Sequence, residues 1–156
     1  MQLKTGEIEG WLRKPDPRIG AVLVYGPDRG LVSERARAFA ERCGVPLDDP
    51  FSAVRFEAAE IEADPGRLAV ELSTIAMFSD RRLVWVRAAS TQKALPEAFQ
   101  AVEAGDATAL LLVEAGDLKK GTALRAAAEN GARAIAIPCY ADDARALDTL
   151  IDTAFA

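Results

Sequence analysis

The sequence predicts an α/β fold in which five parallel strands form one sheet with helices on both faces, a three-layer arrangement. Two observations predict it. Five short segments are almost continuously apolar, as in strands buried on both faces, and they alternate with segments of helical periodicity. With 156 residues, 50% of them hydrophobic, the chain is long enough to bury one such core. The strands are expected within residues 19–26, 51–58, 81–89, 107–115 and 132–140.

The second expected helix illustrates how the helical segments are recognised. Asp64 precedes it as a cap, and Pro65 occupies the first turn, where the N–H that proline lacks would have no partner within the helix. Its periodicity predicts that Leu68, Leu72 and Ile75 are buried. By the same criteria, helices are expected over residues 29–44, 64–76, 94–105, 119–131 and 142–156.

The chain divides into a lead-in helix and loop over residues 1–20 and one domain over residues 21–156. The last expected helix runs to the final residue without a stop signal. This open end favours the interpretation that the domain is the first part of a longer protein.

The turn between the first strand and the next helix stands where a phosphate-binding loop would stand. Compared with the pattern G-x-x-x-x-G-K-[ST], Gly26 fits the first position and Ser33 fits the last. Leu31 replaces the second glycine, and Val32 replaces the lysine whose ammonium neutralises the β- and γ-phosphates. The third strand ends in Arg87 and alanines, where an ATPase needs carboxylates. Two independent losses predict a degenerate loop that binds no nucleotide.

Composition excludes several further functions. The net charge of −5 argues against a large DNA-binding surface, and the absence of histidine removes the commonest general base and metal ligand. Two cysteines without a CxxC spacing, Cys43 and Cys139, indicate reduced thiols of a cytoplasmic protein. The sequence has no signal-peptide core and no membrane-spanning run. We therefore expect no catalytic residues, no metal site and no cofactor.

Two carboxylates follow the fourth strand, Glu114 and Asp117. Paired carboxylates can perform acid–base chemistry or hold a metal ion. No nucleophile or second base accompanies them, so we expect Glu114 to pair with a nearby lysine and Asp117 to cap the next helix.

The most informative anomaly is an apolar pair at the end of the helix that starts near Asp64. Met77 and Phe78 directly precede a polar turn, Ser79–Asp80. They either fold back into the core or project as a hydrophobic wedge for a partner, since methionine and aromatic residues are typical interface anchors. Periodicity does not decide between the two.

Five stretches of the chain are informative when taken together and in order: YGPDRGLVSERA, DPF, TIAMFSDRRLVWVR, LLVEAGDLKKGTALR and AIPCYADDARAL. In this order they resemble the N-terminal domain of the δ subunit of the bacterial DNA polymerase III clamp loader, in its alphaproteobacterial form. The resemblance extends from about Ala21 to Tyr140.

The resemblance implies an AAA+-like domain, related to P-loop NTPases, that has lost nucleotide binding. In the family a wedge of the form Q-x-x-x-[LM]-F binds the β sliding clamp and opens it for loading onto primed DNA during replication. Met77 and Phe78 match the wedge pair, whereas Ser73 departs from the glutamine. The positions between and beside them are Ser73, Thr74, Ile75 and Ala76.

The resemblance also implies partners and a setting. The expected partners are the β sliding clamp, the ATPase subunits and δ′, with DNA contacted only through the whole assembly and no membrane. The chain would be a non-catalytic subunit of the polymerase holoenzyme in the bacterial cytoplasm, and other loader subunits would hydrolyse ATP. The helical and collar domains of the family are missing from this sequence.

Two other functions are open at this stage. A degenerate P-loop enzyme would bind nucleotide despite the replaced lysine. A scaffold domain acting through its sheet edge would bury Met77 and Phe78 in its own core. Whether Lys119, Lys120 or Arg125 contacts DNA in an assembly is also open.

Overall fold

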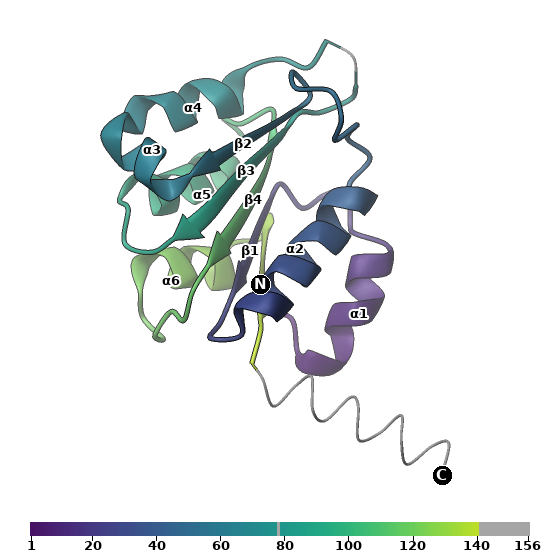
Figure 1. The fold of residues 1–156 in the computed structure, drawn as a ribbon, viewed down its shortest axis with the longest axis vertical. Helices are drawn as coiled ribbons and strands as arrows, with labels where there is room; N and C mark the ends of the chain where they lie inside the picture. Colours follow the sequence, from purple (N-terminus) through teal and green to yellow (C-terminus); the bar gives the residue numbers. More distant parts are fainter. Residues whose placement is uncertain (78, 141–156) are drawn as a thin grey trace.

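The computed structural model describes residues 1–77 and 79–140, and it contains the predicted five-stranded parallel sheet (Figure 1). All strand pairs are parallel, and the order across the sheet is β2-β3-β4-β1-β5. Each strand lies within the segment expected from the sequence. The strands are β1 (Ala21–Tyr25), β2 (Ala53–Glu57), β3 (Leu83–Ala89), β4 (Leu110–Ala115) and β5 (Ala134–Pro138).

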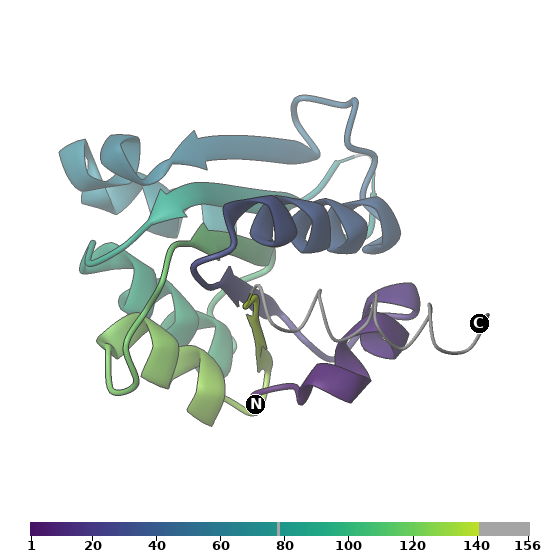
Figure 2. The same ribbon diagram turned by 60° about the horizontal axis from the view of Figure 1, so that its bottom comes forward.

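Helices cover both faces of the sheet, which confirms the three-layer prediction (Figures 1 and 2). The helices α1 and α2 pack on one face, and α3, α4, α5 and α6 pack on the other. Their bounds are α1 (Thr5–Arg13), α2 (Arg29–Arg42), α3 (Ala58–Ala63), α4 (Pro65–Ser73), α5 (Ala94–Ala104) and α6 (Ala123–Asn130). In residues 1–77 and 79–140, no helix combines the length and the apolar composition needed to cross a membrane.

Three features of the helices differ from the predictions, and one predicted helix lies outside the described residues. The helix expected to begin at residue 119 begins at Ala123, after a turn in which the amide of Thr122 donates to the carbonyl of Lys119. The short helix α3 was not predicted, because six residues show too little periodicity to be recognised. The helix predicted to reach residue 76 ends at Ser73. The helix expected over residues 142–156 lies outside the described residues.

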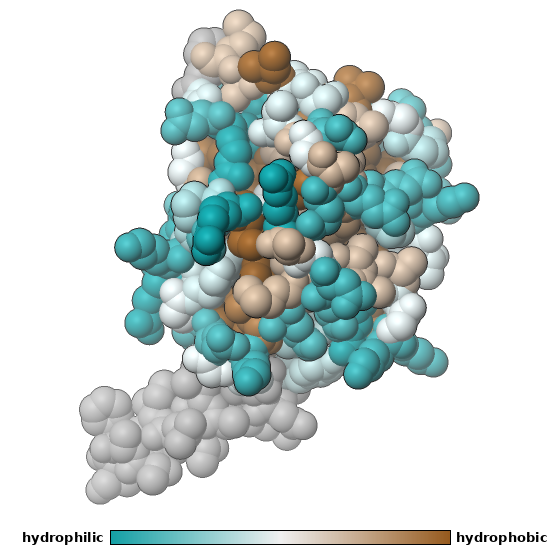
Figure 3. Space-filling model, turned by 180° about the vertical axis from the view of Figure 1, so that it is seen from behind, coloured by the Kyte–Doolittle hydropathy of each residue, from teal (hydrophilic) through white to brown (hydrophobic). Residues whose placement is uncertain are grey.

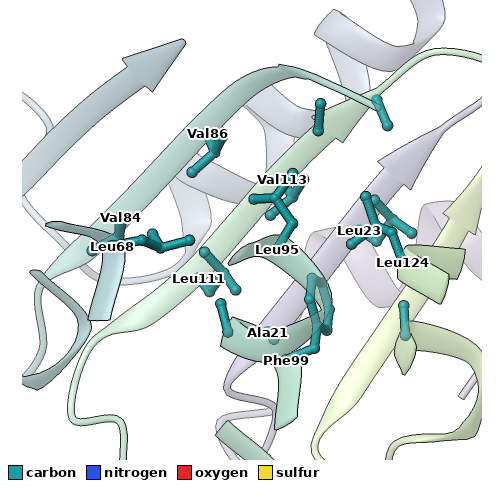
Figure 4. Packing of buried hydrophobic residues seen from close by; sticks show 14 of the residues in the cluster. Ala21, Leu23, Leu68, Val84, Val86, Leu95, Phe99, Leu111, Val113 and Leu124 are labelled. Carbon is teal, nitrogen blue, oxygen red and sulfur yellow. The ribbon is translucent and has the colours of Figure 1, made fainter. Parts of the chain in front are cut away.

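Side chains alternate along each strand and supply a separate core to each face of the sheet. On the face shown in Figure 4, strand residues such as Leu111 and Val113 pack with Phe99 of α5 and Leu68 of α4. The other face holds a second cluster, in which the ring of Trp11 stacks on that of Phe39 at 5.7 Å. Burial of both faces explains why the strands are almost continuously apolar in sequence.

The lead-in segment shares the second core. Ile8 and Leu12 of α1 are buried in it, and the amide of Leu3 donates to the carbonyl of Ala136 at 3.0 Å. The segment therefore lies along β5 at one edge of the sheet, and α1 packs against α2.

Candidate functional site: an apolar patch on the α4–β3 loop

The α4–β3 loop, residues 74–82, begins where side-chain hydroxyls end α4. The hydroxyl of Ser73 donates to the carbonyls of Ala69 and Val70, and that of Thr74 donates to the carbonyl of Val70 at 2.7 Å. The backbone of Thr74 is extended, with ψ of 129°. A continued helix would pair the Val70 carbonyl with the amide of Thr74, but that carbonyl accepts from the two hydroxyls and the Thr74 amide donates to the carbonyl of Glu71. The helix therefore stops before residue 76.

This early end changes the environment of Ile75. The prediction that Ile75 is buried was wrong, because the helical face that buries Leu68 and Leu72 does not continue past Ser73. Ile75 is 74% exposed and Met77 is 71% exposed. The sequence alternatives for Met77 are thereby distinguished, since its side chain projects from the fold. Phe78 lies outside the described residues.

Val70, in the last turns of α4, is a further exposed apolar residue near the loop in sequence. It is 63% exposed, and four large hydrophobic side chains are exposed in the described part of the chain. Three of these four, Val70, Ile75 and Met77, lie within eight residues of one another and form what we call the apolar patch. Hydrophobic residues project at the top of the molecule in Figure 3, the end at which the α4–β3 loop lies in Figure 1.

Backbone hydrogen bonds hold the first end of the loop. The carbonyl of Leu72 accepts from the amides of Thr108 and Ala109, both at 2.9 Å, just before β4. The hydroxyl of Thr108 donates to the carbonyls of Leu72 and Thr74. The patch is therefore carried on a base that is bonded to the neighbouring strand.

A buried arginine holds the second end of the loop. Arg82 directly precedes β3, and its guanidinium donates to the carbonyl of Phe51 and to both the carbonyl and the carboxylate of Glu71 on α4. The sequence analysis missed Arg82 and Glu71. Their only signal was an arginine beside an apolar strand, which does not identify a partner 11 positions earlier.

The predicted phosphate loop follows the carboxyl end of β1, whereas the α4–β3 loop leads into the amino end of β3, so the two loops lie at opposite ends of the parallel strands. The amide of Gly26 donates to the carbonyl of Gly116, and the amide of Asp28 donates to the carbonyl of Cys139. The carboxylate of Asp28 accepts from the amide of Leu31, at the start of α2. Protein groups thus accept from the amides of Gly26, Asp28 and Leu31, and the loss of nucleotide binding stays a prediction.

The remaining loop positions have separate roles. Val32 is buried in the second core, where the pattern would place a lysine, while Ser33 is exposed. Ser33 lines a cleft of about 470 Å³ together with Arg29, Glu57, Arg87 and Glu114. The described residues contain no cluster of three or more potential metal-ligating carboxylates and thiols.

Glu114 interacts with two neighbouring side chains of β3. It accepts from the indole Nε1 of Trp85 at 2.5 Å, and Arg87 lies 3.5 Å away. The expected lysine partner was therefore wrong. Asp117 does not cap the next helix either, because α6 follows Thr122. Burial raises the pKa of Glu114, although the Trp85 hydrogen bond and the Arg87 charge lower it.

The raised pKa of Glu114 predicts a pH effect on stability. Since the folded chain holds this proton more tightly than the unfolded chain, ionising Glu114 lowers the free energy of unfolding as pH rises from about 4.5 through the raised pKa. Glu114→Gln should remove that decrease, because an amide does not ionise. Urea unfolding of both proteins from about pH 4 to about pH 8, roughly the range in which a carboxyl with a raised pKa ionises, measures the difference in their free energies of unfolding. Glu62→Gln, an exposed control, should keep the wild-type profile, and parallel curves for Glu114→Gln and wild type would contradict the prediction.

Comparison with known proteins gives the fold a context. No protein-family model matches the sequence, and no curated protein sequence matches it either. The solved DNA clamp loader delta protein YqeN of Bacillus subtilis matches with a TM-score of 0.64 at 14% identity, over 87% of this chain and 42% of its own. A DNA polymerase III gamma subunit-related protein of Thermotoga maritima matches with a TM-score of 0.54 at 12% identity, over 86% of this chain and 46% of its own.

These identities are low, and this chain spans less than half the length of either protein. The likeness is therefore one of fold. The chain shares its five-stranded parallel α/β fold with part of each of these two proteins.

Proposed function

We propose that this chain is the clamp-binding domain of a δ subunit of a bacterial DNA polymerase III clamp loader. Its apolar patch, with Phe78, would enter a hydrophobic pocket on the β sliding clamp. The observation that carries the proposal is the exposure of Met77 and Ile75 on a loop whose two ends are bonded to the rest of the fold. The sequence resemblance places the wedge pair at Met77 and Phe78, and the fold likeness to clamp loader proteins supports the same assignment.

The physical contribution of the wedge is the burial of apolar surface. Moving two large side chains such as Met77 and Phe78 from water into an apolar pocket contributes roughly 3–6 kcal/mol before ordering costs. A pocket that exists only in a distorted clamp would convert this binding energy into a shift toward the open ring. The chain itself makes and breaks no bond in this mechanism, and ATP is used by other subunits of the loader.

Other parts of the proposed setting rest on the same likeness. Assembly with the ATPase subunits and δ′ would require the family's additional domains, and the protein would act in the bacterial cytoplasm. A direct role in DNA binding is not favoured. Arg125 is engaged with Glu129 and with the ring of Tyr25, so that the basic spot is reduced to Lys119 and Lys120.

Each of the two alternative functions requires a structural feature of its own. A scaffold acting through its sheet edge requires Met77 in the core, and its exposure favours a binding patch instead. A degenerate P-loop enzyme requires free amides around Gly26, whereas those of Gly26, Asp28 and Leu31 donate to groups of the protein.

Two parallel calorimetric titrations test the proposal: one with the β sliding clamp of the same organism, and one with ATP and Mg²⁺. We expect saturable binding of the clamp and no heat from ATP beyond dilution. ATP binding without clamp binding would reject the proposed function in favour of the P-loop enzyme.

A further inference from the structure

Arg82 links three separate segments at the base of the α4–β3 loop. Its Nη1 donates to the carbonyl of Glu71 at 2.9 Å and its Nη2 donates to the Glu71 carboxylate at 2.8 Å. Its Nε donates to the carbonyl of Phe51 at 2.9 Å, and the guanidinium lies over the Phe51 ring. One side chain thus joins the last turns of α4, the start of β3 and the segment before β2.

The contacts of Arg82 are shielded from water. Its side chain is only 3% exposed, and that of Glu71 is 20% exposed. A pair this buried is stabilising only when its hydrogen bonds are made, because each unpaired partner would carry the full cost of lost hydration. The pair therefore keeps the two ends of the loop at one fixed separation.

The opposite end of the loop is fixed independently. The carbonyl of Leu72 accepts from two amides before β4, and the hydroxyl of Thr108 reaches the carbonyl of Thr74. Near the second end, the hydroxyl of Ser79 donates to the carbonyl of Arg81. Between these attachments, Ile75 and Met77 project into solvent.

We propose that Arg82 is a positioning residue for the apolar patch, an inference that rests on the proposed function. By joining α4 to β3 through Glu71, it orders the loop before a partner arrives. Binding then does not have to supply the entropy of ordering the loop backbone. Arg82 does not itself touch the partner in this proposal, because its guanidinium is buried.

The chain offers a matched control in Arg125. That arginine also donates to a carboxylate, Glu129, and to a backbone carbonyl, that of Leu118, and its guanidinium lies over the ring of Tyr25. Its side chain is 14% exposed. Arg125 belongs to α6, and the hydrogen bonds and ring contact named above lie away from the described residues of the α4–β3 loop. Its removal therefore disturbs a similar set of bonds elsewhere.

The test compares Arg82→Met with Arg125→Met for binding to the β sliding clamp, at a temperature where circular dichroism shows both folded. We expect Arg82→Met to bind about tenfold more weakly than wild type, as for loss of order in one or two loop residues, and Arg125→Met to stay within about twofold. Hydrogen exchange of residues 74–77 should be faster only in Arg82→Met. Arg82→Lys and Glu71→Gln each keep a polar partner, so their affinities for the clamp should lie between those of wild type and Arg82→Met. These two variants replace Arg82→Met in the test if Arg82→Met does not fold.

The outcomes separate this inference from the proposed function. Equal loss of affinity in Arg82→Met and Arg125→Met, or unchanged affinity and exchange in Arg82→Met, overturns the positioning role while clamp binding by wild type stands. If wild type does not bind the clamp, the proposed function fails. Hydrogen exchange of residues 74–77 is then the remaining test of the ordering role. Faster exchange in Arg82→Met alone supports that role, and equal exchange in Arg82→Met and wild type overturns it.

Discussion

Met77→Ala combined with Phe78→Ala is expected to weaken binding to the β sliding clamp by about 2 kcal/mol or more, roughly 30-fold, as for interface anchor residues. The reason is that the exposed side chain of Met77 gains its apolar contacts only in the complex. The same exposure predicts an unchanged melting temperature, because removing solvent-exposed atoms takes no packing from the core. Titration calorimetry and a thermal melt of the double variant check the two halves of this prediction.

Two further variants test whether the loss of clamp affinity is specific to the Met77 and Phe78 pair. Val70→Ala removes the part of the patch that lies on α4, and we expect a smaller loss because it deletes fewer apolar atoms. Lys119→Ala with Lys120→Ala changes two exposed residues on another loop and should leave the affinity unchanged. Wild-type affinity in the Met77 and Phe78 double variant would place the interface elsewhere. A lowered melting temperature would mean that the pair also supports the core.

Gly26→Ala is expected to lower the free energy of unfolding by about 3 kcal/mol or more, among the larger effects of single substitutions. A Cβ at Gly26 would lie 2.1 Å from the carbonyl oxygen of Cys139, with further backbone atoms of Cys139 within 3 Å. The φ angle of Gly26 is +145°, a conformation that other residues rarely adopt. Since the obstacle is backbone at the end of β5, relief requires movement of the sheet. Urea denaturation measures the loss.

Gly30→Ala provides the matched control on the same segment. Gly30 lies in the first turn of α2, and a Cβ there would meet only the Asp28 carboxylate, at 3.6 Å. Alanine should be neutral or stabilise the helix by about 0.5–1 kcal/mol, because glycine loses more backbone entropy. If Gly26→Ala proved as stable as Gly30→Ala, the close approach of Cys139 would not explain the glycine.

The expected outcome at Gly26 also changes the interpretation of the degenerate phosphate loop. Its first glycine matches the nucleotide pattern, yet the backbone of Cys139 is sufficient reason for a glycine at this position. A matching glycine therefore carries little evidence for phosphate binding here. The substitution of Val32 for lysine is more informative, because Val32 is buried in the core that α2 forms with the sheet.

The sequence by itself determined the layers of this protein. All five strands lie in the segments where continuous apolar character predicted them, because burial on both faces leaves that pattern in the residues themselves. It also identified Met77 as an unusual apolar residue before a polar turn. These features are local, and a local pattern suffices to find them.

Only the tertiary structure decided how the patch is presented. The carbonyl of Leu72, which a further turn of α4 would pair, accepts instead from the amides of Thr108 and Ala109. Ile75 is therefore exposed where periodicity predicted burial. The bonds from Arg82 to Glu71, and from Trp85 to Glu114, join residues far apart in the chain. Removing these polar groups from water costs free energy, which the hydrogen bonds between the partners offset. Which groups meet depends on the packing of the strands that carry them.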